Sequence, residues 1–337
     1  MTQSRSTQAL ILELVRSTGA VDAAAAIRLR ARELLATYVE KFGEPDRPIN
    51  VDILASLQGI VRSDDLPFHS DDAELVPDGT GGVTMRVNPD RPGTRKRFSI
   101  AHEISHTFFP DYTRKAWCRT DARYRDRNNP EDFLEMLCDI GAAELLFPMP
   151  WFSMDAAGVT GVADLVQLAK SYHASREATL RRYVETSPES VAVAYFGWKL
   201  KPTQKATVGR KGQGNLLGLT PEDEIRDAIR LRIEYSIASD GFQRDRYFLP
   251  KDKSVENGGP IYQAAAGGTP VEGEAFLDLG QAAGTYAVWA VPLWTPDDRL
   301  GANGENAVAA VLRPIAVPKP VVRKNGRDDG PTLFDGM

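Results

Sequence analysis

Two histidines four residues apart lie in the apolar run RFSIAHEISHTFF at residues 97–109, with a glutamate directly after the first. The whole chain contains only four histidines, so two of them in one short run are unusual. Their spacing of four residues in this run favours an α-helix. Residues four apart on a helix lie one above the other on the same face. His102 and His106 can therefore both reach one metal ion, at the distance of about 2.0–2.1 Å that zinc requires. Glu103 lies about 100° further around the helix, where it can reach a water molecule held by that ion.

A catalytic zinc site needs a third protein ligand, and no third histidine follows at short spacing. The segment PEDFLEMLCDIGAAELLFP at residues 130–148 is apolar almost all the way round, which is typical of a buried helix. Glu135 and Asp139 lie four apart within it, and buried carboxylates need partners or a metal. We expect Glu135 to be the third ligand and Asp139 to accept a hydrogen bond from a ligand histidine. The alternative is a buried ion pair with an arginine elsewhere.

This HExxH arrangement is typical of zinc peptidases, whereas the competing interpretation is a chance pair of core histidines. Zinc lowers the pKa of its bound water toward about 7 and polarises the scissile carbonyl. Glu103 then accepts the proton of the water and passes it to the leaving amine. Three residues are candidate donors to the oxyanion, although surface or packing roles explain each as well: Tyr112, Tyr124 and His173.

Patterning along the chain predicts an α+β protein. Residues 20–42 read as an amphipathic helix with Asp22 as its cap and Gly43 as its stop. The segments GGVTMRVNP and SVAVAYFGWKL alternate like strands, and the composition changes near residue 190. The expected organisation is a peptidase domain at residues 1–189 with helix-turn-helix-like helices at about 162–186, a second α/β domain at 190–317, and a disordered tail at 318–337.

The bulk composition narrows the class of protein further. A net charge of −5 argues against a general nucleic-acid coat or a membrane-surface protein. Cys118 and Cys138 are the only cysteines, which excludes a disulfide framework and favours a reducing cytoplasm. No apolar run reaches the length of a transmembrane helix, so no membrane association is expected.

Three segments together resemble the successive signatures of the ImmA/IrrE metallopeptidase family: RKRFSIAHEISH, EMLCDIGAAELLFP and LAKSYHASREATLRRYV. The resemblance covers about residues 20–187. His102, His106 and Glu135 match the metal ligands of the family, and Glu103 matches the general base. The family usually has Asn at the position of Asp139, so this chain reads E-x-x-x-D, similar to gluzincin peptidases.

The resemblance implies a zincin-like peptidase fold with a helix-turn-helix-like extension, followed in several members by a GAF-like sensor domain. It implies Zn²⁺ as cofactor and a helix-turn-helix transcriptional repressor as the substrate, cut after DNA damage or phage infection. Within the family the chain is most similar to proteases encoded beside anti-phage defence operons. Single-stranded DNA is the activating signal that this similarity implies.

The rival function is a non-proteolytic regulator with a structural zinc, which binds DNA or a partner through the helix-turn-helix-like zone. In that case Arg176, Arg181 and Arg182 would face DNA. Retention of Glu103 argues against this rival, because a purely structural zinc site needs no base. In the resembled family this zone packs on the peptidase, which favours a structural or substrate-docking role.

The stretch at residues 113–127 interleaves basic side chains with aromatic ones, a combination that suits single-stranded nucleic acid. The alternative is a solvated loop whose aspartates balance part of the charge. Cys118 lies in this stretch, and as a fourth zinc ligand it would expel the catalytic water and keep the enzyme latent. The alternative is that Cys118 is an ordinary loop residue beside Trp117, since free cysteines more often simply pack. The candidate nucleic-acid contacts are Arg114, Lys115, Arg119 and Arg123.

Overall fold

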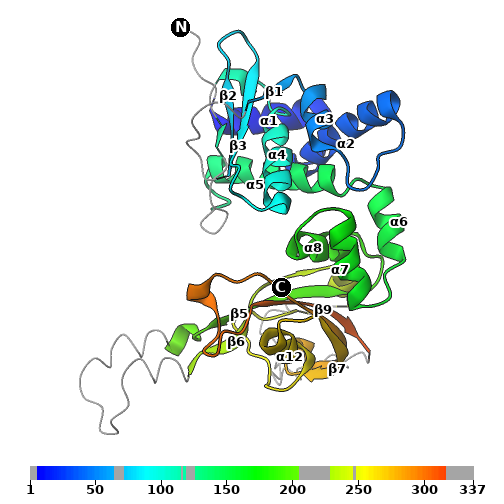
Figure 1. The fold of residues 1–337 in the computed structure, drawn as a ribbon, viewed down its shortest axis with the longest axis vertical. Coiled ribbons are helices and arrows are strands. Elements are labelled where there is room, and N and C mark those ends of the chain that lie inside the picture. Colours follow the sequence, from blue (N-terminus) through cyan, green and yellow to red (C-terminus); the bar gives the residue numbers. More distant parts are fainter. Residues whose placement is uncertain are drawn as a thin grey trace, which may run out of the picture.

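A computed structural model shows a mixed α+β protein, as the sequence predicts (Figure 1). Helices dominate the N-terminal half, and a large sheet dominates the C-terminal half. Among the described residues, no helix has both the length and the apolar character that a membrane span requires. The structure describes residues 6–63, 72–114, 117–118, 126–204, 228–245 and 248–315.

The N-terminal helices begin and end where their capping residues predict. α1 spans Thr7–Thr18 and α2 spans Ala23–Phe42. The side chain of Asp22 accepts a hydrogen bond of 2.7 Å from the backbone N–H of Ala25, which caps the first turn of α2. Gly43 follows with φ at 82°, a conformation that glycine adopts without steric cost. Both boundaries expected from the sequence are confirmed.

A small sheet supports the helix that carries the two histidines. Its strand order is β1-β3-β2-β4, with β1 parallel to β3 and the other pairs antiparallel. The elements of this region are α3 (Val51–Leu57), β1 (Ile60–Arg62), β2 (Ala73–Pro77), β3 (Val83–Val87), α4 (Gly93–His106) and β4 (Trp117–Cys118). Arg95 in the first turn of α4 donates two hydrogen bonds, of 2.7 and 2.8 Å, to the buried carboxylate of Asp72, just ahead of β2.

The histidine helix ends earlier than the sequence indicates. The pattern predicts a helix as far as Pro110, whereas α4 ends at His106. The next three backbone N–H groups bond to carbonyls three residues back, beginning with Thr107 to Ile104 at 3.0 Å. This tighter turn closes the helix directly after the second histidine.

The long apolar segment after residue 130 forms the buried helix that the sequence predicts. α5 spans Pro130–Leu146 and lies against α2 and α4. Its first turn is capped by Asn129, whose side chain accepts from the backbone N–H of Glu131 at 2.9 Å. Three shorter helices follow, and the last two occupy the predicted helix-turn-helix-like zone: α6 (Trp151–Ala157), α7 (Val162–Ser171) and α8 (Arg176–Thr186).

The C-terminal half is built on an antiparallel sheet of five described strands in the order β6-β5-β9-β8-β7. The strand expected from SVAVAYFGWKL is present as β5, and β8 pairs antiparallel with β9. The described residues of this half also include the short helices α11 (Asp240–Arg244) and α12 (Pro260–Gly267). The strands are β5 (Ala192–Lys199), β6 (Arg230–Ala238), β7 (Val271–Leu277), β8 (Gly284–Pro292) and β9 (Val308–Pro314).

The two faces of the large sheet belong to two different apolar cores. Successive side chains of a strand point to opposite faces. Val193 and Tyr195 on β5 join the core that contains the N-terminal helices, whereas Ala194 and Phe196 join a second core with α12. Figure 1 accordingly shows α7 and α8 between the N-terminal helices and the sheet, with α12 against the sheet as well. Every strand position in the middle of β5 is therefore buried.

A buried carboxylate joins α8 to the N-terminal helices. Glu144 on α5 is fully buried. Its oxygens accept from Arg182 of α8 at 2.7 Å and from Arg32 of α2 at 2.8 Å. The Arg182 side chain is 8% exposed, whereas the Arg32 side chain is 55% exposed. Because a buried charge needs a partner, Arg182 is the arginine that Glu144 depends on most.

Replacing Arg182 by alanine should lower the free energy of unfolding by about 3–5 kcal/mol, because it leaves Glu144 buried beside an exposed partner only. Arg32→Ala removes the other arginine from the same carboxylate and serves as the matched control. It should cost about 1 kcal/mol or less, as exposed ion pairs do. Urea unfolding followed by circular dichroism measures both values, and equal losses would contradict this ranking.

Candidate metal centre

The centre depends on a close approach of α4 and α5. Gly141 on α5 faces Ser105 on α4, and a Cβ atom at Gly141 would lie 2.5 Å from Ser105 Oγ and 2.9 Å from Ser105 Cβ. It would also lie 3.2 Å from Ile27 of α2. Only glycine allows this separation of the helices. The carboxylates of Glu135 and Asp139, on the preceding turns of α5, thereby reach the histidines of α4.

His102 is fully buried between these two carboxylates. Its Nδ1 atom lies 2.9 Å from an oxygen of Asp139, and its Nε2 atom lies 3.2 Å from an oxygen of Glu135. Burial has the largest effect on the pKa of His102 and lowers it. The hydrogen bonds and charges of Asp139 and Glu135 together outweigh burial and raise this pKa to about 9.

His106 presents the same nitrogen to the same carboxylate. Its Nε2 atom lies 3.5 Å from the second oxygen of Glu135, and its Nδ1 atom lies 3.4 Å from Cys138 Sγ. The indole of Trp117 stacks on the imidazole, with ring centroids 4.6 Å apart and an interplanar angle of 25°. The ring is therefore held on one face by an aromatic side chain and at its edge by a thiol.

The separations between these donor atoms fit a zinc-type ion. Ligands at about 2.0–2.1 Å in a tetrahedron lie about 3.3–3.4 Å from one another. The Nε2 atoms of His102 and His106 lie 3.2 and 3.5 Å from the oxygens of Glu135. Two imidazole nitrogens and one carboxylate are also a donor set that catalytic zinc accepts. The centre can therefore hold such an ion while an open position remains.

A second grouping uses a thiol in place of the carboxylate. His102, His106 and Cys138 each bring one ligand atom within 4.8 Å of the others. The sulfur, however, faces Nδ1 of His106, on the side of the ring opposite the atom that faces Glu135. The set of two Nε2 atoms with Glu135 is the more coherent one, because both rings then present the same nitrogen to one point.

Glu103 completes the polar part of α4. Its side chain is fully buried on the same helix as the two histidines. A buried carboxylate departs from ordinary core composition, since burying a charge is costly. Such placement is typical of a functional group and not of a packing residue.

Several sequence-predicted residues lie outside the described part of the protein: the side chains of Arg114 and Cys118, and residues Lys115, Arg119, Arg123 and Tyr124. The backbone of Cys118 is described, and it pairs with Glu74 of β2. The carbonyl of Tyr112 accepts a hydrogen bond of 2.8 Å from the Trp117 indole. His173 lies exposed in the turn between α7 and α8, so the structure does not bring it to the α4–α5 pair.

The interpretation that the arginines of α8 face DNA is wrong for Arg182, which is buried on Glu144. Arg176 donates a hydrogen bond of 2.8 Å to the carbonyl of Pro292, at the end of β8. Only Arg181 of the three makes an exposed pair, with Glu185 one turn along the same helix. The basic residues of α8 mainly serve its packing.

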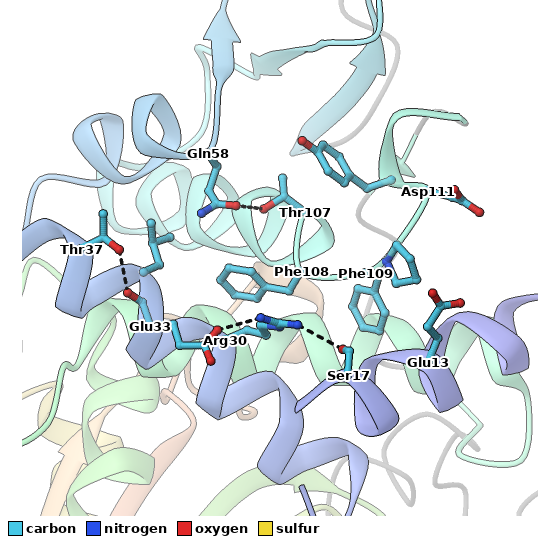
Figure 2. Close-up of a pocket in the computed structure, with 13 residues that line it drawn as sticks. Glu13, Ser17, Arg30, Glu33, Thr37, Gln58, Thr107, Phe108, Phe109 and Asp111 are labelled. Carbon is cyan, nitrogen blue, oxygen red and sulfur yellow. Dashed lines mark hydrogen bonds and ion pairs between the residues drawn. The ribbon is translucent and has the colours of Figure 1, made fainter. Parts of the chain in front are cut away.

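A separate groove of about 510 Å³ opens beside the C-terminal end of α4 (Figure 2). It lies between α1, α2 and the residues that follow His106. Within it, Arg30 donates to Glu33 at 2.9 Å and to Ser17 at 3.1 Å, and Thr107 donates to Gln58 at 2.9 Å. Neither histidine of α4 lines this groove, so it is distinct from the metal centre.

Three residues of the centre were not foreseen in these roles. In the sequence, Cys138 stood out only as one of two cysteines, Trp117 lay in the stretch considered for nucleic-acid binding, and Gly141 carried no signal beyond its place in an apolar helix. The structure puts the first two against His106 and the third against Ser105. A thiol one residue before Asp139, on the helix expected to face the histidines, was the only available clue.

Comparison with known proteins finds a metallopeptidase-like domain in the part of the chain that contains this centre. Residues 61–183 match the model of the Peptidase_M78 family, described as the IrrE N-terminal-like domain. The radiation response metalloprotease IrrE of Deinococcus radiodurans is 30% identical over 189 residues, which are 56% of this chain and 55% of that protein. Its namesake from Deinococcus deserti is 30% identical over 174 residues, 51% of this chain and 58% of that protein.

The matched segment includes α4, α5, α7 and most of α8, and thus the whole candidate centre. The class of the domain is therefore that of a metallopeptidase. Residues 61–183 thus resemble the IrrE N-terminal-like domain, and the chain spans about half the length of the curated relatives it matches. The match to a solved Mycobacterium tuberculosis transcriptional regulator covers 91% of this chain and 80% of that protein, at 13% identity and a TM-score of 0.47.

Replacing Gly141 by alanine should separate α4 from α5, because the added Cβ collides with Ser105. The free energy of unfolding should fall by about 1–3 kcal/mol, and zinc affinity should fall with it. Gly93→Ala, at the start of α4, is the matched control, since nothing lies within 4 Å of its Cβ position. Thermal unfolding and chelator competition measure the two effects. An unaffected Gly141→Ala protein would refute the close approach.

Proposed function

We propose that this chain is a zinc-dependent endopeptidase in which His102, His106 and Glu135 bind the metal. The observation that carries the proposal is the convergence of both histidine Nε2 atoms on the carboxylate of Glu135, at 3.2 and 3.5 Å. The match to the IrrE N-terminal-like domain supports a metal at this point. Zinc is the ion that this mixture of nitrogen and oxygen ligands suits best.

The side chains around the ligands have defined tasks in this proposal. When bound, zinc lowers the pKa of water toward about 7 and polarises the scissile carbonyl. Asp139 accepts the Nδ1 proton of His102 and so keeps Nε2 free for the metal. Glu103 accepts the proton of the attacking water and then donates it to the leaving amine.

The proposed substrate is a helix-turn-helix transcriptional repressor, cut in the cytoplasm in response to DNA damage or phage infection. Two relatives named radiation response metalloproteases support a stress-linked role. The narrower similarity to CapP, a protease paired with the repressor CapH in anti-phage operons, rests on the sequence signatures. It motivates single-stranded DNA as the activator.

The proposed organisation is a zincin-like peptidase domain at residues 1–189 and a GAF-like regulatory domain at 190–317. The five-stranded antiparallel sheet, packed against helices on both faces, supports an α/β sensor domain. The rival proposal of a DNA-binding regulator is disfavoured, because Arg182 and Arg176 serve packing contacts.

The decisive experiment is to incubate the zinc-loaded protein with the helix-turn-helix repressor encoded beside its gene, with and without single-stranded DNA. A single cut in the repressor, found by mass spectrometry and abolished by a chelator, is expected. Absence of cleavage under both conditions, with zinc bound, would refute the peptidase proposal.

Glu103→Gln should keep stoichiometric zinc and lose cleavage by a factor of about 10²–10⁴, because it removes only the proton acceptor. His102→Ala should instead lose the zinc, which separates the two roles. Zinc content is measured by atomic absorption and cleavage by gel assay. A Glu103→Gln protein that cuts at the wild-type rate would show that the base is another group.

Zinc affinity should increase with pH, because the metal must displace a proton from His102, whose pKa is raised to about 9. Binding to chelator-treated protein should therefore release protons between about pH 7 and 9, and affinity should level off above that range. Calorimetry in buffers of different ionisation enthalpy counts the protons. In Asp139→Asn the pKa of His102 should fall, so the plateau should begin at lower pH. Affinity that does not change with pH would contradict the assignment.

A further inference from the structure

We propose that Cys138 is a positioning residue, whose sulfur accepts a hydrogen bond from Nδ1 of His106 and thereby directs Nε2 toward Glu135. This inference rests on the proposed metal site and deepens it. It gives the second histidine the orienting partner that Asp139 provides for the first. The role differs from metal ligation, because the sulfur lies on the far side of the imidazole from Glu135.

The geometry of His106 carries the argument. The Sγ–Nδ1 separation of 3.4 Å is a hydrogen-bond distance for sulfur, and both side chains are fully buried. Trp117 covers one face of the ring, so rotation of the ring is restricted. Metal-bound histidines almost always donate their second ring N–H to an acceptor, which fixes the tautomer and the orientation. At His106 that acceptor is a thiol.

The spacing along α5 explains how one helix serves both rings. Glu135, Cys138 and Asp139 lie at positions i, i+3 and i+4, which share one helix face. Glu135 faces both Nε2 atoms, while Asp139 and Cys138 each face one Nδ1 atom. A single turn of α5 therefore supplies the proposed ligand and the partners of both proposed histidine ligands.

The choice of a thiol has an electrostatic reason. Glu103 is fully buried here, and Glu135 and Asp139 already contribute two further carboxylates to the same centre. A fourth carboxylate at position 138 would add another charge that burial makes costly. A neutral thiol accepts a hydrogen bond, although weakly, without adding that charge. The two histidines thus have partners of unequal strength, with His102 bound to the stronger acceptor.

Two substitutions in the full-length protein distinguish this role from simple packing. If Cys138 only packs, alanine should be tolerated at least as well as serine, because serine buries an additional hydroxyl. If Cys138 positions His106, the serine hydroxyl should replace the sulfur as acceptor and alanine should not. The order of the two variants is therefore opposite under the two explanations.

Zinc affinity, measured by chelator competition, should fall about tenfold in Cys138→Ala and stay within about threefold of wild type in Cys138→Ser. Ala142→Ser places a hydroxyl one turn further along the same buried helix and controls for its burial alone. Cys138→Ala with wild-type affinity, or Cys138→Ser weaker than Cys138→Ala, would overturn the proposal.

Two measurements on the wild-type protein remain decisive even if a variant fails to fold. Nitrogen-15 NMR of the zinc-loaded protein should show His106 protonated at Nδ1 and metal-bound at Nε2. Cobalt substitution should give no thiolate-to-metal charge-transfer band. The opposite tautomer would overturn the positioning role, because Nδ1 would then have no proton to donate to the sulfur. A thiolate band would overturn it as well, because Cys138 would then be a ligand. Loss of zinc binding in His102→Ala tests the underlying site independently.

Discussion

The contact between Gly141 and Ser105 sets the distance between α4 and α5, and the rest of the centre depends on that distance. The histidines come from one helix and the carboxylates of Glu135 and Asp139 from the other, about thirty residues later in the chain. With a larger residue at position 141 the helices could not approach, and Glu135 would not face both rings. Because protein interiors are close-packed, this contact does not tolerate even one added carbon at position 141.

The local parts of this arrangement follow from the sequence, since they depend on the geometry of one helix at a time. The spacing of His102 and His106 and the spacing of Glu135 and Asp139 each predict a shared face. The ends of α2 and the course of α5 follow from caps and apolar patterning in the same way. Periodicity also separates the helical half of the chain from the strand-rich half.

Contacts between elements are not contained in such patterns. Nothing in the spacing of Cys138 or Trp117 shows that both lie against His106, because one is on α5 and the other on a two-residue strand. The burial of Arg182 was missed for the same reason. A basic residue that faces solvent and one that pairs with a buried glutamate 38 residues away look alike in a sequence.

Because side chains of β5 alternate between two cores, sequence changes in this strand affect both halves of the molecule. A mutation at Val193 disturbs the core shared with the N-terminal helices, while one at the adjacent Ala194 disturbs the core shared with α12. Inserting a single residue into this strand would exchange the two sets, because side chains alternate with every step. Single substitutions in β5 can therefore change one core without the other. An insertion or deletion in β5 requires compensating changes in both cores.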